Sequence, residues 1–304
     1  MKKKYMYQIW MLSGIIGLLT ACSNDHYDAD RQVPLSVSSV GMTVGGMQSR
    51  AATELTSGSM GVFCLADNGY TATDNVEYTY SGGWSSIRPI YLDSRKATLV
   101  AYYPYGSVSF AGTVCTLAAQ KYDESKDIYY DVLRDEVNNA SPVANFVMER
   151  VYACLKLKIT RMATYDAAKA CNVTNVNLKS APLFYPTRTL DLSTGLWGGA
   201  AVVGGWTYAL NTGAIAAGTT NESFNVLLPA QDVTNGLTLT LTVDGTNRSV
   251  TVPGTKFENE LKSGHEYIVS LQIRDTELTV PAVSNSEGTF GGGTNPSTPS
   301  EGDA

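Results

Sequence analysis

The sequence predicts an all-β protein, with two tandem Greek-key β-sandwich domains behind an amino-terminal export segment. Strand-forming residues are abundant, including 18 tyrosines in 304 residues, and 28 glycines are available for turns. Short apolar runs alternate with polar residues, and no long segment places apolar residues at helical spacing. After export, about 280 residues remain, more than a single core usually organises, so we expect two domains.

The first 21 residues are interpreted as a secretory signal peptide. Three lysines precede an apolar run over residues 9–19, shorter than the roughly 20 residues that span a membrane. Leu19-Thr20-Ala21-Cys22 then resembles a bacterial lipoprotein box, in which the cysteine is alkylated and the signal is cut before it. We therefore predict a lipid on Cys22, where each buried methylene contributes about 0.8 kcal/mol of membrane affinity. An ordinary signal with an incidental cysteine is the alternative.

Charge and cysteine content limit the function classes. A net charge of -6, with lysines and arginines scattered singly, argues against a nucleic-acid partner. Four further cysteines have no Cys-x-x-Cys spacing, so neither zinc nor redox chemistry is indicated. They are either small apolar side chains in strands or members of one or two disulfides, and their spacing does not decide between these. The four are Cys64, Cys115, Cys154 and Cys171.

The amino-terminal half is expected to form one sandwich over residues 51–141, behind a tether and first strand in residues 22–50. Val33, Leu35 and Val37 alternate with small polar residues and predict that first strand over 33–40. Arg50 and Ala51 follow in a loop of small residues suited to a trypsin-like protease. Pro89 lies inside the run 84–92 and cannot donate a backbone hydrogen bond, so part of this run is expected to lie at the edge of a sheet. The other expected strands are 60–66, 76–80, 97–105, 114–117 and 127–133.

A break at residues 138–142 is taken as the domain boundary, and a second sandwich is expected over residues 142–283. Its clearest element is a hairpin around Asp244-Gly245, because this dipeptide suits the positive φ angles of a two-residue turn. The tail, residues 284–304, is rich in glycine, serine and proline and is expected to be disordered. The other expected strands are 152–159, 173–178, 188–192, 206–210, 224–228, 265–273 and 277–283.

No catalytic or metal-binding pattern stands out. His265 opens a strand without a nucleophile motif nearby, and is interpreted as a structural histidine at the surface or an edge. The carboxylates of 123–136, Asp127 among them, are interpreted as solvated loop charges, since Lys126 interrupts any calcium-like spacing. Tyr102 and its neighbours to Tyr105 are expected to pack as a strand end and not to form a ligand platform. The sequence thus predicts no enzyme, cofactor or metal.

Several stretches together resemble the fimbrillin family of Bacteroidetes, the subunits of type V pili, over nearly all of the mature chain. This resemblance implies transthyretin-like sandwiches. Arg150 stands where the family often has a histidine, and the carboxyl end lacks the aromatic finish of many relatives. The matching stretches are the lipobox, residues 49–53, 60–63, 101–105, 224–230 and 264–267.

The resemblance implies a surface lipoprotein of the outer membrane that a trypsin-like protease cuts after Arg50. The cut would release the strand that holds Val33, Leu35 and Val37, and a neighbouring subunit's last strand would fill the groove by strand addition. In this chain the donor would be residues 277–283, with Leu278, Val280 and Ala282 alternating as the side chains that fill the groove of the neighbour.

Two functions of different class follow. The first is a pilus subunit for adhesion, in the shaft or, if the last strand stays in its own domain, at the tip. Its partners would be other fimbrillin subunits and a host or bacterial receptor. The alternative is a monomeric surface lipoprotein that binds a glycan on Trp84, Trp197, Trp206 or the tyrosine clusters.

Overall fold

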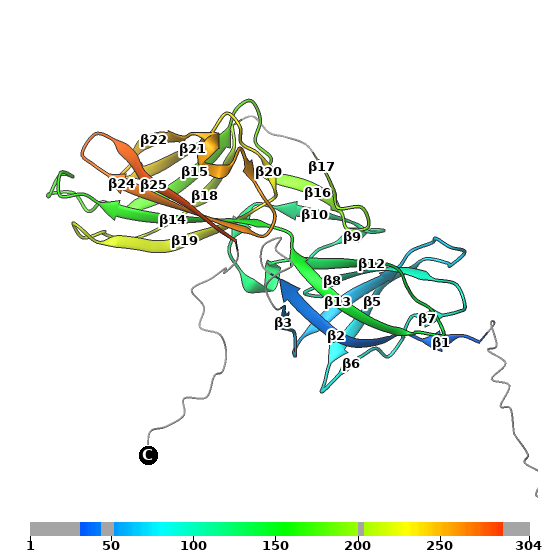
Figure 1. The fold of residues 1–304 in the computed structure, drawn as a ribbon. Helices are drawn as coiled ribbons and strands as arrows, with labels where there is room; N and C mark the ends of the chain where they lie inside the picture. Colours follow the sequence, from blue (N-terminus) through cyan, green and yellow to red (C-terminus); the bar gives the residue numbers. More distant parts are fainter. Residues whose placement is uncertain (1–30, 44–51, 200–203, 288–304) are drawn as a thin grey trace, which may run out of the picture.

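The computed structural model describes residues 31–43, 52–199 and 204–287 (Figure 1). In these residues the regular structure is β-strand, apart from the short 3-10 segments η1 (Glu124–Lys126) and η2 (Gly254–Phe257). The all-β prediction is confirmed. The signal peptide and the tail from residue 288 lie outside the described residues. No helix in the described ranges is long and apolar enough to cross a membrane.

An eight-stranded sheet dominates the amino-terminal part, and its ends approach one another because β2 lies against β6. In spatial order the strands are β3 (Thr53–Glu54), β2 (Ser36–Thr43), β13 (Val143–Arg150), β12 (Tyr129–Val137), β8 (Ala97–Tyr103), β4 (Ser59–Cys64), β5 (Thr73–Tyr80) and β6 (Trp84–Ser85). The expected strand 84–92 is therefore interrupted around Pro89, and its end forms β7 (Tyr91–Leu92), which pairs with β1 (Val33–Pro34).

β8 is apolar along most of its length because it lies between two hydrophobic cores. Leu99 and Ala101 face the core enclosed by the eight-stranded sheet, whereas Val100 and Tyr102 face a second core on the other side. A strand covered on both faces loses the polar half of its alternation. Tyr102 is fully buried, which confirms that it packs and is no surface platform.

The carboxyl-terminal part is a pair of facing sheets around a third core. Asp244 and Gly245 both have positive φ, at 45° and 77°, as the predicted hairpin between β21 and β22 requires. One sheet has the order β11 (Gln120–Lys121), β19 (Thr220–Leu228), β14 (Ala153–Arg161), β24 (His265–Ile273), β25 (Leu278–Glu287). The other has the order β18 (Trp206–Ala209), β15 (Val173–Ser180), β21 (Leu237–Val243), β22 (Thr246–Val252).

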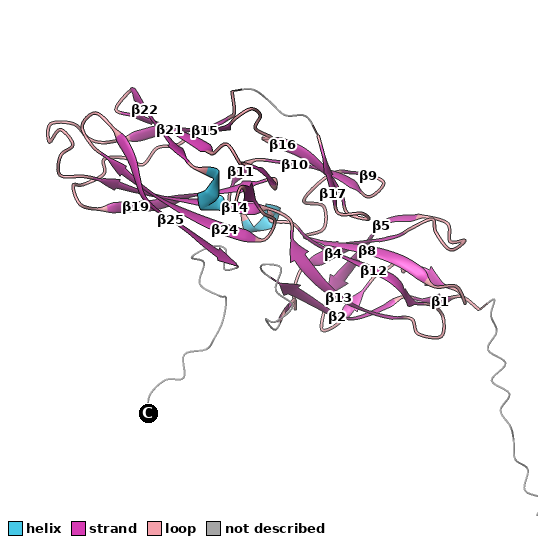
Figure 2. Cartoon of the chain, turned by 45° about the horizontal axis from the view of Figure 1, so that its top comes forward, coloured by secondary structure: helices cyan, strands magenta, loops and turns pink. Residues whose placement is uncertain are grey.

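A sheet made from both halves of the sequence lies between these parts (Figure 2). Its order is β17 (Leu196–Gly198), β16 (Thr187–Asp191), β10 (Val114–Ala118), β9 (Phe110–Ala111). Cys115 opposite Leu190 marks the register of β10 with β16. The assignment of these two strands to separate sandwiches was therefore wrong. A short pair, β20 (Gln231–Asp232) with β23 (Glu260–Leu261), completes the described strands.

The expected domain boundary at residues 141 and 142 also needs correction. Asn138 and Ser141 form a bridge that turns the chain tightly from β12 into β13, and both strands belong to the eight-stranded sheet. The chain leaves this sheet only after Arg150, where β14 begins. The polar break is a turn within one sheet.

Candidate functional site

The strand interpreted as removable lies in the eight-stranded sheet. β2 runs parallel to β13 and pairs with it along its whole length, one of two parallel pairings among the described strands. Leu35, Val37 and Val40 point into the core, with exposed fractions of 4%, 5% and 0%. The alternation in the sequence thus located the inward face correctly.

Residues just before β2 are tied to the same part of the molecule. Val33 is only partly buried and pairs with Leu92 between β1 and β7. The backbone N–H of Leu35 donates to the carbonyl of Ile90 at 2.7 Å. The β1–β7 pairing involves fewer residues than the β2–β13 ladder. The hydrogen bonds to β13 therefore hold this segment to the sheet more than those to β7 do.

The outer edge of β2 is paired only towards its carboxyl end. β3 pairs with it at Gly41 and Met42, and the N–H of Leu55 donates to the carbonyl of Val40 at 2.7 Å. If β2 were withdrawn, β13 would have unpaired backbone groups along one side, and Ala144, Phe146 and Met148 would lose their cover from the core side. A vacancy of this kind is an apolar groove with a row of hydrogen-bonding groups at its wall.

The expected cleavage site lies in the connection from β2 to β3. Arg50 and Ala51 are outside the described residues, as is Cys22. The connection starts after Thr43 and ends before Thr53. A cut within it would separate β2 from the rest of the covalent chain.

The last strand, β25, is the edge strand of the five-stranded sheet and pairs antiparallel with β24. Leu278 is buried and Val280 is partly buried against the core of its own domain. Ala282, however, is exposed, and Val283 packs against the core instead. A β-bulge around Pro281 inserts one residue and shifts the alternation.

The strand also continues to residue 287, so residues 284–287 are not disordered tail.

A buried ion pair lies where β13 ends, and sequence reasoning missed it. Nε of Arg150 is 2.8 Å from Oδ2 of Asp127, and the guanidinium also donates to the hydroxyl of Tyr129. The assignment of Asp127 to solvated loop charges was wrong, because the residue is only 1% exposed. Burial raises the pKa of its carboxyl to about 6, against the opposing effect of Arg150. The available signal was that Arg150 continues the inward alternation of Phe146 and Met148.

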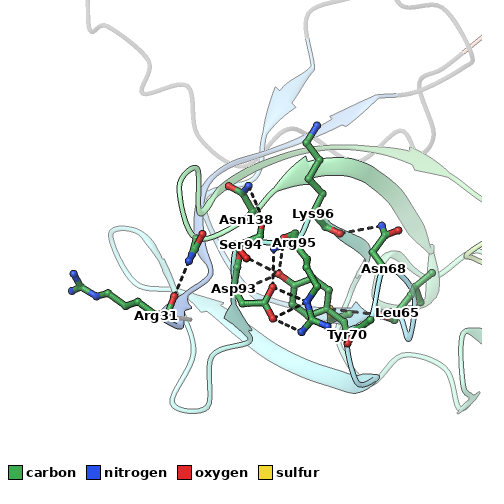
Figure 3. A network of polar contacts seen from close by, with 12 residues as sticks. Arg31, Leu65, Asn68, Tyr70, Asp93, Ser94, Arg95, Lys96 and Asn138 are labelled. Carbon is green, nitrogen blue, oxygen red and sulfur yellow. Dashed lines mark hydrogen bonds and ion pairs between the residues drawn. The ribbon is translucent and has the colours of Figure 1, made fainter. Parts of the chain in front are cut away.

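A polar network holds the loop after β7 (Figure 3). Asp93 pairs with Arg95, whose guanidinium carbon lies 4.9 Å from the ring centroid of Tyr70. The hydroxyl of Tyr70 donates to the carbonyl of Arg95 at 2.8 Å and accepts from the N–H of Asp93 at 3.0 Å. Hydrogen bonds from Arg95 lower the pKa of Asp93 to about 2. Tyr70, Asp93 and Arg95 line a hollow of about 490 Å³. Gln32 lines it too, so the segment before β1 forms part of its wall.

The tryptophans suggested for glycan binding occupy different environments. Trp84 is buried against Tyr80 and offers no platform. Trp197 is covered on one side by the Arg188 guanidinium, 5.1 Å from its ring centroid. Trp206 stacks on Tyr208, with ring centroids 5.6 Å apart, and both line a hollow of about 670 Å³. The polar residues around that hollow are Gln120, Lys121, Tyr122, Asp123, Glu124 and Lys126.

The remaining candidate groups have structural surroundings. His265 is 9% exposed, stacks on Tyr267 and has Nδ1 3.5 Å from Oδ1 of Asn285. No group of histidines, cysteines and acidic residues suited to a metal occurs in the described ranges. The four described cysteines are free and buried, so the disulfide alternative is not what the structure contains: Cys64, Cys115, Cys154 and Cys171.

Known proteins share this architecture. A protein assigned to cell adhesion from Bacteroides uniformis is 19% identical, with a TM-score of 0.53 over 82% of this chain and 98% of its own. A fimbrial protein from Bacteroides vulgatus is 14% identical, with a TM-score of 0.51 over 82% of this chain and 99% of its own. At these identities the likeness shows a common fold.

Sequence comparison adds the family. No curated protein matches the chain. A family model described as fimbrillin-like matches residues 49–286, which include every described strand from β3 to the body of β25. The chain therefore belongs to the fimbrillin-like family.

Proposed function

We propose that this protein is a structural subunit of a pilus, exported as a lipoprotein and assembled by strand exchange after proteolysis. The observation that carries the proposal is the position of β2. Leu35 just before this strand and Val37 and Val40 within it fill the core, yet its outer edge is only partly paired and the connection that follows it contains Arg50. Membership of the fimbrillin-like family supports a pilus-type subunit.

The proposed sequence begins at the outer membrane. A lipid on Cys22 would hold the precursor there, and a trypsin-like protease would cut between Arg50 and Ala51. Loss of β2 would leave backbone groups of β13 without partners and would expose core side chains, both of which cost free energy. The last strand of another subunit would restore the pairing by β-strand addition. Such a fibre is suited to adhesion, with a host or bacterial surface receptor as a further partner.

Limited trypsin treatment of the purified mature chain, residues 22–304, tests this proposal. We expect ladders in non-boiled gels only after the cut. Arg50→Gln should abolish them, whereas the matched control Arg31→Gln should not, because Arg31 lies on the amino-terminal side of β2. Val283→Asp, which changes a half-buried residue of β25, should also suppress them while the monomer stays folded. Ladders from uncut protein, or unchanged ladders from Arg50→Gln, would contradict the proposal.

A second candidate function has its own observation, the stacked pair Trp206 and Tyr208 in a hollow with polar side chains. Aromatic faces flanked by amide, carboxylate and ammonium groups suit a saccharide. A glycan array on uncut monomer tests it, with Trp206→Ala compared against Trp197→Ala. Binding that both variants lose equally would not belong to this hollow.

A further inference from the structure

The inward side chains of β2 and β25 follow the same pattern. For β2 they are Leu35, directly before the strand, and Val37 and Val40 within it, and in β25 they are Leu278, Val280 and Val283. Both strands therefore read Leu-x-Val-x-x-Val, in residues 35–40 and 278–283. The residues between them are small: serines in the first strand, and threonine, proline and alanine in the second.

The step of three in this pattern requires a bulge, because a regular strand repeats every two residues. In the β2–β13 ladder, Val37 pairs with Ala144 and Ser39 pairs with Asn145, so Ser38 has no partner in the register. β25 has its extra residue at the same place of the pattern. There, Thr279 pairs with Gln272 and Ala282 pairs with Ser270, which leaves Val280 and Pro281 as the two residues opposite one.

Pro281 fits this correspondence. If Leu278 is superimposed on Leu35, Pro281 falls on Ser38, the unpartnered residue of β2. Proline lacks a backbone N–H and would interrupt the ladder at an ordinary position. At the bulge it costs no pairing.

The apolar side chains of β25 would be more deeply buried in the place of β2 than they are in their own sheet. Leu35, Val37 and Val40 are all at most 5% exposed in their groove. In β25, an edge strand, Leu278 is equally buried but Val280 and Val283 remain only partly covered. Two valines would thus gain cover by moving from the edge of their own sheet into the place of β2.

We infer that the groove left by β2 accepts β25 of a second copy of this chain, parallel to β13, in one register. Leu278, Val280 and Val283 take the places of Leu35, Val37 and Val40. The inference rests on the proposed strand exchange and adds its register, because the pattern and the bulge of β25 match those of the strand that it would replace.

Disulfide trapping in the purified chain tests the register. In β2, Ser39 pairs with Asn145 and Gly41 with Val147, so the inferred register pairs Ala282 with Asn145 and Ser284 with Val147. All four of these residues on β13 and β25 are exposed, so cysteines there should not disturb folding. The four native cysteines in the described residues are buried and should not compete.

Two matched variants, Asn145→Cys with Ala282→Cys and Val147→Cys with Ser284→Cys, should give cross-linked ladders after trypsin and mild oxidation. The two crossed combinations are the controls. Their cysteines are displaced by two residues, about 6.6 Å along the strand, which adds to the strand spacing and exceeds the roughly 7 Å Cα separation that a disulfide tolerates. We expect at least about tenfold less cross-linked product from them, given this geometric limit.

The outcomes separate the register from the exchange itself. Ladders on non-denaturing gels that cross-link only in the crossed pairs, or in none, overturn the register while strand exchange survives. If no variant and no parent chain forms ladders after the cut, the proposed function fails and the register fails with it. Ladders that require a second, different subunit would overturn self-assembly.

Discussion

The carboxylate of Asp127 and the guanidinium of Arg150 form an ion pair of 2.8 Å with both side chains buried, at 1% and 5% exposure. The pair joins the segment after η1 to the end of β13, next to the point where the chain passes into β14. It therefore fixes the end of the strand that pairs with β2. Changes to this pair should affect the stability of the whole amino-terminal sheet.

Removal of one partner should be far more harmful than removal of both. Asp127→Leu removes both the counter-charge and the acceptor oxygens and leaves the Arg150 charge buried without this carboxylate, which typically costs about 3 to 5 kcal/mol. The double variant Asp127→Leu with Arg150→Met replaces the charges by apolar groups of similar size and should lie closer to the wild type. Urea unfolding of the three proteins checks this. Equal losses in the single and double variants would contradict it.

The same carboxyl predicts a pH dependence. Its pKa is raised to about 6 in the folded protein, above its ordinary value, so the folded state holds the proton more tightly than the unfolded state. The stabilisation from protonation is complete below the ordinary value and is lost as pH rises through 6. Each pKa unit corresponds to about 1.4 kcal/mol.

We therefore expect the free energy of unfolding of the wild type, relative to Asp127→Asn, to fall between pH 4 and pH 7. Chemical denaturation at several pH values measures the difference, and the variant serves as the control for all other titrating groups. A difference that rises with pH would show that Arg150 lowers the pKa of the Asp127 carboxyl more than burial raises it.

Local patterns predicted strands well but not their partners. Asp244-Gly245 identified a hairpin because the two strands are joined by the turn itself. The pairing of β10 with β16 spans some seventy residues, and alternation in each strand contains no information about it. The break at Asn138 has the composition of a linker, yet its side chain accepts hydrogen bonds from the backbone of Ala140 and Ser141 and closes a tight turn.

The candidate site shows the same limit at residue level. Leu35 and Val37 lie on the inward face, as alternation predicts, because they precede the bulge at Ser38. Ala282 is exposed in β25 because it follows the bulge at Pro281, after which simple alternation fails. Arg150 ends β13 and Asp127 lies in the segment after η1, and their contact depends on the fold.

Truncation inside the groove should cost stability that truncation beside it does not. Leu35→Ala removes a buried side chain and leaves a cavity, which typically costs about 2 to 5 kcal/mol. Ser36→Ala changes the exposed neighbour and should stay within about 0.5 kcal/mol. Thermal or urea unfolding of the uncut chain gives both values. Similar values for the two variants would mean that Leu35 adds little to the core.

The four buried thiols should resist labelling in the folded protein. Burial raises the pKa of Cys154 to about 12 and that of Cys115 to about 11, so the reactive thiolate stays scarce even at pH 9. A thiol reagent should therefore react with them only after denaturant is added. Rapid labelling of one cysteine in native protein would place that residue at a local opening, and its identity can be read by mass spectrometry.

The position of the proline in β25 offers a direct test of how this strand pairs after exchange. In the inferred register Thr279 takes the place of Ser36, whose N–H donates to the carbonyl of Pro142 at 2.8 Å. Thr279→Pro would delete that hydrogen bond, whereas Pro281→Ser changes the unpartnered bulge residue and deletes none. Pro142 is half-buried, so its unsatisfied carbonyl should cost about 1 kcal/mol, the lower end of the usual range, and Thr279→Pro should slow ladder formation about fivefold, whereas Pro281→Ser should not. Because Thr279 also pairs with Gln272 in its own sheet, the unfolding midpoint of each uncut variant is the control. Equal slowing by both variants would show that proline at the bulge is not what permits β25 to enter the groove.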